Sequence, residues 1–100
     1  MEVNITKQEN VTTVAFAGRL DTPAAQKVTE TLAPVLEAAD GTIVLDCKEL
    51  TYISSSGLRI FLALRKAAAA QGGKIIVKDI NNDIRQVFMM TGFLSLFDIQ

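Results

Sequence analysis

The sequence of 100 residues contains no histidine and only one cysteine, Cys47. Without histidine, the usual general base that titrates near neutral pH is missing, which excludes Ser-His-Asp and Cys-His hydrolase chemistry. A single cysteine forms no internal disulfide, and it leaves a zinc site with at most one thiolate among carboxylates, so structural zinc is excluded. The sequence therefore predicts no catalytic residues, no metal site and no cofactor.

An excess of charge of either sign is also lacking. Ten basic residues stand against eleven acidic ones, and the bases are scattered from Lys7 to Arg85 without a dense cluster, so no nucleic-acid partner is expected. No apolar run approaches the roughly 18 residues of a membrane-spanning helix, so no membrane insertion is expected. The first ten residues have neither the basic region nor the apolar core of a signal peptide. The expected location is cytoplasmic.

The composition that is present is that of an ordinary globular domain. Hydrophobic residues make up 49% and charged residues 21% of the chain, far from the low hydrophobicity and high charge of disordered proteins. A chain of this length buries about two thirds of the surface that its unfolded form exposes, which is enough for one core. We therefore expect a single domain over residues 1–100.

The first elements are predicted by alternation and by proline. Apolar and polar residues alternate over 3–6 and again over 11–17, which predicts an antiparallel hairpin. Thr22 before Pro23 predicts the start of a helix, with the threonine hydroxyl as its cap and the proline at the first helical position. Pro34 lies inside the same apolar stripe, where it removes one backbone hydrogen bond, so we expect a kink there.

The rest of the chain alternates between strands and helices. The short continuous apolar run over 42–46 is typical of a central parallel strand that is covered on both faces. The pattern then predicts a connection over 48–53, a helix over 54–71 stopped by Gly72 and Gly73, a strand over 74–78, a helix capped by Asn81 and Asn82 and ended at 91–93, and a short strand over 97–99. The expected fold class is α/β, a small mixed β-sheet with a parallel centre, covered by helices on at least one face.

The residues of chemical interest are three adjacent serines, Ser54, Ser55 and Ser56. They stand at the start of the helix predicted over 54–71. One interpretation is structural, because a serine at this position accepts a hydrogen bond from a free backbone N–H and caps the helix. The other is a phosphorylation switch, since the helix N-terminus stabilises an added negative charge. A serine nucleophile of the hydrolase type is not supported, because Ile53 stands where that motif needs glycine.

Leu58 and Leu62 lie off the main apolar stripe of this helix and are flanked by Arg59. They form either an exposed apolar patch beside Ser55 or a second packing contact with a neighbouring segment. Cys47 is interpreted as a small apolar filler and not as a nucleophile. A nucleotide-binding module is not supported, because no glycine-rich phosphate loop opens a helix.

Several landmarks in order carry a family resemblance that spans nearly the whole chain. They are Gly18-Arg19-Leu20-Asp21 after the hairpin, Ile43-Val44-Leu45-Asp46, Ile53-Ser54-Ser55-Ser56-Gly57-Leu58, Met90-Thr91-Gly92-Phe93 and Phe97-Asp98-Ile99. Together they resemble the STAS domain of anti-sigma factor antagonists. Many members continue into a final helix near the position of Gln100, so we expect one face of the sheet to be less covered here.

The resemblance implies a cytoplasmic, non-enzymatic switch. Its partner is an anti-sigma factor that is also a serine kinase; the unphosphorylated domain binds this partner and frees a sigma factor, and a serine phosphatase reverses the phosphorylation. The phosphorylated residue of the family falls on Ser55, with Ser54 and Ser56 as further candidates because Ser54 replaces the family aspartate.

The resemblance also implies a partner-binding rim. Asp21 is placed there by the resemblance, whereas the sequence pattern alone favours a loop carboxylate at a helix start. The full set of partner-binding candidates is Asp21, Ser54, Ser55, Ser56, Gly57, Leu58, Arg59 and Leu62. The alternative function on the same fold is that of an unphosphorylated accessory or regulatory subunit of a transport system, which the loss of the family aspartate favours.

Overall fold

Five strands form one mixed sheet in which the order in space equals the order in the chain, β1-β2-β3-β4-β5. The computed structural model describes all residues, 1–100. The strands are β1 (Glu2–Gln8), β2 (Val11–Leu20), β3 (Thr42–Ile53), β4 (Lys74–Lys78) and β5 (Asp98–Ile99). The β1–β2 hairpin is antiparallel and every later pair is parallel, which confirms the predicted mixed sheet with a parallel centre.

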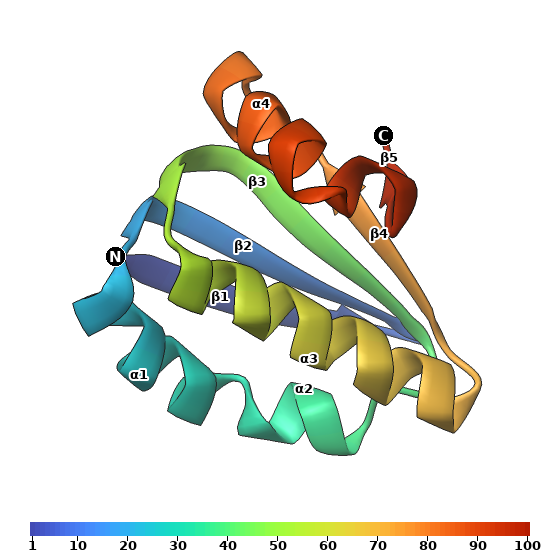
Figure 1. Cartoon of the computed structure of the whole chain (residues 1–100). Helices are drawn as coiled ribbons and strands as arrows, with labels where there is room; N and C mark the ends of the chain where they lie inside the picture. The colour runs from blue at the N-terminus through green and yellow to red at the C-terminus, as the bar shows by residue number, and fades with distance from the viewer.

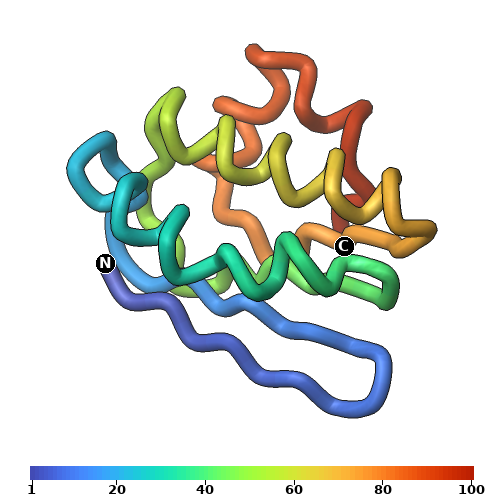
Figure 2. The backbone as a smooth tube through the Cα atoms, turned by 90° about the horizontal axis from the view of Figure 1, so that it is seen from below, coloured from blue at the N-terminus to red at the C-terminus, as the bar shows by residue number.

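The helices all cover one face of this sheet (Figure 1). They are α1 (Thr22–Thr31), α2 (Ala33–Glu37), α3 (Ser55–Gln71) and α4 (Asn82–Thr91), with a short 3₁₀ turn η1 (Phe93–Ser95). Each crossover moves one strand further in the same direction, so connections of one handedness place every helix on the same side. Figure 2 shows α1–α2, α3 and α4 as neighbouring rows, with the β1–β2 hairpin extending beyond them.

Alternate residues of the central strands make the core. Phe16 of β2 and Leu45 of β3 point toward the helices and are fully buried, whereas Val44 and Asp46 lie on the other face and are half-buried. The prediction that strand 42–46 is covered on both faces is therefore wrong, because all crossovers fall on one side. The face of the sheet that carries Val44 has no helix over it (Figure 1).

All five phenylalanines meet between α3, α4 and the sheet. The Phe61 ring of α3 lies 5.3 Å from that of Phe16 and 6.0 Å from that of Phe88, measured between ring centroids. Phe93 and Phe97 join the cluster with their centroids 5.7 Å apart. Contacts of this kind add to the burial of the rings themselves, and they tie the last third of the chain to the centre of the sheet.

Strand β3 is longer than the sequence predicts. Residues 48–53 were expected to be a connection, but they continue β3 and pair with the end of β2, Gly18 with Leu50 and Leu20 with Ile53. Two register shifts, at Ala15–Ala17 and at Gly18–Arg19, break the alternation that identifies a strand. Because the pairing is irregular, the sequence pattern does not identify this part of the strand. The strand ends at Ile53, directly before Ser54.

The first helix differs from the prediction at both ends. Asp21 and not Thr22 is the N-cap, since its Oδ1 accepts a hydrogen bond from the Ala24 N–H at 3.0 Å. A carboxylate accepts this bond more strongly than a hydroxyl does. The kink expected at Pro34 is a full interruption at Leu32, which separates α1 from α2, because Pro34 has no N–H to donate to the preceding turn.

The predictions for the chain from Ser54 onward are confirmed. Helix α3 and strand β4 have the expected bounds, and Asn81 caps α4 by accepting from the Ile84 N–H at 2.8 Å. Gly72 and Gly92 end α3 and α4 with φ angles of 79° and 80°, in the left-handed region that glycine adopts without strain. The short strand near the C-terminus is β5. None of the helices has the length and hydrophobicity needed to cross a membrane.

Cys47 is a buried filler, as predicted. Its side chain is fully buried, and burial, with smaller contributions from the carboxylates of Asp46 and Asp79, raises the pKa of the thiol to about 12. The native protein should therefore not react with a thiol reagent such as Ellman's reagent at pH 8, whereas the urea-unfolded protein should react fully. Reaction of the native protein as fast as the unfolded one would contradict this assignment.

The same pKa shift predicts a loss of stability at high pH. The raised pKa means that the folded chain retains the thiol proton at pH values where the unfolded chain has released it. The free energy of unfolding should therefore fall as the pH rises from the unfolded pKa of 9 toward 12. The measurement is urea denaturation across this range, and Cys47→Ala should show a smaller decrease than the wild type.

Candidate functional site

The carboxyl ends of β2 and β3 bring two helix starts together. Leu20 and Ile53 are paired at the ends of these strands, and the Ser54 N–H donates to the Leu20 carbonyl oxygen at 2.9 Å. The next residue after β2, Asp21, begins α1, while Ser54 begins α3. The sequence placed Asp21 and the three serines at one edge of the sheet, and the structure brings them together there.

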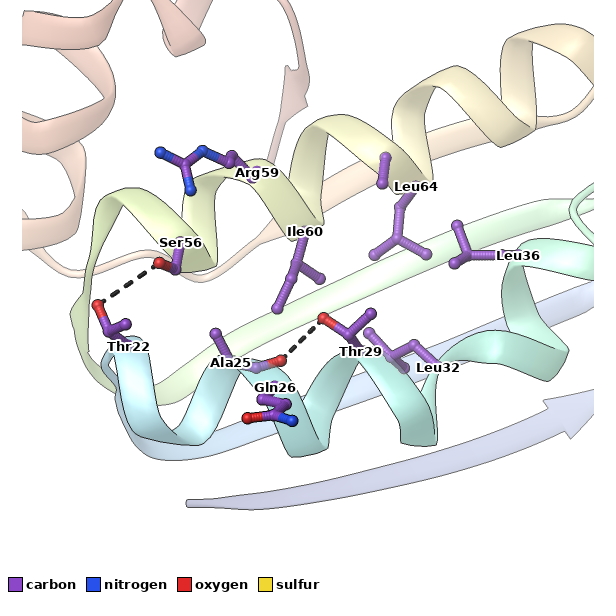
Figure 3. Close-up of a pocket in the computed structure, with 11 residues that line it drawn as sticks. Thr22, Ala25, Gln26, Thr29, Leu32, Leu36, Ser56, Arg59, Ile60 and Leu64 are labelled. Carbon is purple, nitrogen blue, oxygen red and sulfur yellow. Dashed lines mark hydrogen bonds between the residues drawn. The ribbon is translucent and has the colours of Figure 1, made fainter.

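The three serines have different hydrogen bonds. Ser54 is the N-cap of α3: its Oγ accepts from the Gly57 N–H at 3.2 Å and donates to the Leu20 carbonyl oxygen at 3.0 Å. Ser56 Oγ donates to Thr22 Oγ1 of α1 over 3.5 Å, a long contact that joins the two helix starts (Figure 3). Ser55 is exposed, and its hydroxyl takes part in no hydrogen bond within the protein. The free hydroxyl of the three is therefore that of Ser55.

The environment of Ser55 suits a negative charge. Ser55 is the first residue of a helix of 17 residues, and the first N–H groups of such a helix have no carbonyl partner inside the helix. Their dipoles stabilise an anion at this end. Arg59 lies one turn further along α3 and is exposed, and Figure 3 shows its guanidinium directed back toward the start of the helix.

Gly57 and Leu58 form the support of the site and not its surface. A Cβ on Gly57 would lie 2.8 Å from side-chain atoms of both Ile53 and Leu20, so α3 approaches the sheet closely at this glycine. Leu58 is only 8% exposed and belongs to the core, and Leu62 is half-buried against it. The exposed patch of Leu58 and Leu62 was one of two interpretations, and it is wrong. The packing interpretation is correct, because Leu58 belongs to the core cluster and Leu62 packs against that cluster.

Ser54→Ala should reduce the free energy of unfolding by about 1–2 kcal/mol, because it removes the helix cap and one further hydrogen bond. The measurement is urea denaturation, with Ser55→Ala as the matched control. That control should change the stability by less than about 0.5 kcal/mol, since Ser55 is exposed and its hydroxyl makes no hydrogen bond within the protein. Equal losses for the two variants would contradict the different roles assigned to these serines.

Two features of this edge were not anticipated from the sequence. The Arg19 guanidinium lies 4.2 Å above the ring centre of Tyr52, in a cation–π contact that depends on the shifted register of β2 and β3. A groove of about 460 Å³ also runs between α1–α2 and α3. Its size depends on the distance between packed helices, for which a single sequence carries no signal.

No group of three or more His, Cys, Asp or Glu side chains is placed to hold a metal ion.

Comparison with known proteins agrees with this architecture. The family model for the STAS domain matches residues 2–100, and the chain belongs to this family. More particularly, its relatives are anti-sigma factor antagonists. The chain is 31% identical over 100 residues to the anti-sigma-B factor antagonist of Bacillus subtilis, an alignment that covers 99% of this chain and 90% of that protein.

Solved structures of anti-sigma factor antagonists share the fold. SpoIIAA in its unphosphorylated form superimposes with a TM-score of 0.76 at 18% identity, covering 99% of this chain and 87% of that one. An anti-sigma factor antagonist from Mycobacterium paratuberculosis gives a TM-score of 0.81 at 18% identity, covering 98% and 83% of the two chains. The phosphorylated form of the Bacillus SpoIIAA is also similar, with a TM-score of 0.76 at 19% identity and coverages of 99% and 91%.

Proposed function

We propose that this protein is an anti-sigma factor antagonist controlled by phosphorylation of Ser55. In its unphosphorylated form it binds an anti-sigma factor that is also a serine kinase, and a sigma factor is released as a result. The observation that carries the proposal is the exposed, unbonded hydroxyl of Ser55 at the start of α3. The relatives named as anti-sigma factor antagonists and the phosphorylated form of SpoIIAA support it.

The chemistry is supplied by the partner. The Ser55 oxygen attacks the γ-phosphorus of ATP bound to the kinase, its proton passes to a base of the kinase, and ADP leaves. The new phosphate adds about −1.5 to −2 charges at neutral pH beside the free N–H groups of α3. The domain therefore remains folded, and the added charge acts on the docked partner. A cytoplasmic serine phosphatase restores the hydroxyl.

The partner-binding rim is built in two layers. Asp21, Ser55, Ser56 and Arg59 present side chains at the edge where α1 and α3 begin. The remaining candidates from the sequence, Ser54, Gly57, Leu58 and Leu62, hold the start of α3 against the sheet through capping and packing. Substitutions in the second group should weaken partner binding by loosening the helix start.

The test is mass spectrometry of the intact protein and of its peptides after incubation with ATP and an anti-sigma factor kinase chosen as a candidate from the neighbouring genes. One added phosphate should map to Ser55 and disappear in Ser55→Ala. Ser95→Ala is the matched control, an exposed serine whose hydroxyl donates to the Gly92 carbonyl oxygen at 2.9 Å. Phosphate on Ser95, or on Ser54 while Ser55 remains unmodified, would contradict the proposal.

A second function is favoured by one observation, that Ser54 stands where the resembling family has aspartate. In this alternative the domain is an unphosphorylated accessory subunit of a transport system. The same experiment separates the two functions. Stable binding to a transporter ATPase without any phosphate on Ser54, Ser55 or Ser56 would support the transport role and exclude the switch.

A further inference from the structure

The groove between α1–α2 and α3 has a polar mouth and an apolar floor (Figure 3). Its mouth lies at the start of α3, where Ser56 and Thr22 meet, and Arg59 is the single charged residue among those that line it. The floor consists of aliphatic side chains from both helices, namely Ala25, Leu32, Leu36, Ile60, Ala63 and Leu64. Gln26 and Thr29 of α1 also line the groove, so it has an apolar floor, polar side chains on its α1 wall and a single charged residue on α3.

The floor limits what the groove can hold. Leu32, Ile60 and Leu64 are between 0% and 8% exposed, so little apolar surface remains to be covered by a ligand. A long hydrocarbon chain bound here would leave most of its own surface in water. Removal of apolar surface from water is what drives the binding of such a chain, so it would bind weakly. A segment of polypeptide that inserts one aliphatic side chain and keeps its backbone outside fits this shape better.

The position of the groove identifies which polypeptide this is. Ser56 and Arg59 line the groove, and they lie one and four residues after Ser55. A kinase that brings ATP to the Ser55 hydroxyl must contact this turn of α3, so the groove continues the surface that it covers. The unpaired Arg59 guanidinium, which Figure 3 draws beside the start of α3 on the side away from α1, selects a carboxylate on a segment that crosses α3 as it enters the groove.

We propose that the groove receives a segment of the anti-sigma kinase that carries an aliphatic side chain beside an aspartate or glutamate, and that Arg59 is the cation on which the switch operates. This rests on the function proposed above. In the unphosphorylated protein the Arg59 guanidinium pairs with the carboxylate of the partner. After phosphorylation it pairs with the phosphate on Ser55.

The spacing of the two residues allows this exchange. Side chains four positions apart on a helix are neighbours, with Cβ atoms about 5–6 Å apart. The long side chain of Arg59 also points toward the start of α3 (Figure 3), the direction that helical geometry favours. The phosphate therefore removes the cation from the groove and places a dianion beside the partner's carboxylate, and both effects oppose docking.

The first experiment tests the groove with a matched pair of tryptophan variants. Ala63 is exposed and lines the groove, whereas Ala69 is exposed on the same helix outside it. Binding of the unphosphorylated protein to the kinase is measured by calorimetry with ADP present. Ala63→Trp should weaken binding about tenfold or more, while Ala69→Trp should change it less than about threefold. Equal effects of the two variants would overturn the groove as the docking site.

The second experiment follows the guanidinium without any partner. Phosphoserine is incorporated at position 55, and the second pKa of the phosphate, ordinarily about 6, is measured by ³¹P NMR. Loss of the arginine in Arg59→Gln should raise this pKa by about half a unit or more. Lys66→Gln, an exposed lysine further along α3, should leave it unchanged. Asp21 is present in both variants, so its charge cancels in the comparison.

The outcomes separate this inference from the proposed function. If Ser55 is phosphorylated and the protein then loses kinase binding, while Ala63→Trp binds the kinase like the wild type, the switch stands and the role of the groove is wrong. If the unmodified wild type does not bind the kinase, the proposed function fails and the docking segment fails with it. If the phosphate pKa is the same in Arg59→Gln as in the wild type, Arg59 does not pair with the phosphate on Ser55, and its proposed change of partner is wrong whatever the binding experiments show.

Discussion

Phe61→Ala should lower the free energy of unfolding by about 3–5 kcal/mol, a large part of the 5–15 kcal/mol that holds a typical domain together. Phe61 is fully buried and contacts three other rings, those of Phe16, Phe88 and Phe97, at centroid distances of 5.3, 6.0 and 6.3 Å. These partners come from a strand, a helix and the C-terminal segment, which cannot all move to fill the cavity.

The measurement is the free energy of unfolding from urea denaturation followed by circular dichroism. Phe61→Leu serves as the control, because it retains an apolar side chain at the centre of the cluster and should cost about half as much. A loss below about 1 kcal/mol for Phe61→Ala would mean that the aromatic cluster is not the centre of stability.

Gly73→Ala should destabilise the fold by about 3 kcal/mol or more, because the new methyl group would overlap backbone atoms that have nowhere to move. A Cβ at this position would meet the carbonyl oxygens of Ala39 and Gly41. Gly41 also accepts the hydrogen bond from the Lys74 N–H at 2.9 Å, which holds the start of β4 beside β3. The methyl group would therefore separate the two central strands at their origin.

The neighbouring glycine provides the control. Gly72 has a φ of 79° and no atom within 4 Å of a Cβ built on it, so Gly72→Ala should cost only the strain of the left-handed conformation, about 1 kcal/mol. Both variants are compared by urea denaturation. A Gly72→Ala protein that is less stable than Gly73→Ala would contradict the assignment of close approach to Gly73.

These two glycines illustrate what the sequence reveals about the fold. Adjacent glycines after an apolar helix predict a stop, and Gly72 does end α3 as a left-handed cap. The role of Gly73 depends on carbonyl groups more than 30 positions away in the chain, and local patterns carry no such information. The same limit explains β3, whose second half was missed because its pairing with β2 is irregular.

The sequence predicted the position of the candidate site more fully than the roles of its individual residues. Topology alone brought Asp21 and Ser55 to one edge, since the ends of parallel strands meet there. The different roles of the three serines depend on which of their hydroxyls donates a hydrogen bond to the Leu20 carbonyl oxygen. Periodicity left open whether Leu58 and Leu62 lie on the surface or in the core, because both residues lie off the one apolar stripe of the helical wheel and still pack with the core cluster.

The coincidence of strand order with chain order affects how the molecule is made. During synthesis each parallel strand leaves the ribosome after the strand it will pair with, and the helix that joins them is the next to cover the growing sheet. No strand waits for a partner that is encoded several strands later, because each parallel pair closes only over the helical segment that joins its two strands. The turn with Ser55 is assembled once β3 is in place, while β4 and the aromatic residues that secure α4 are still to come.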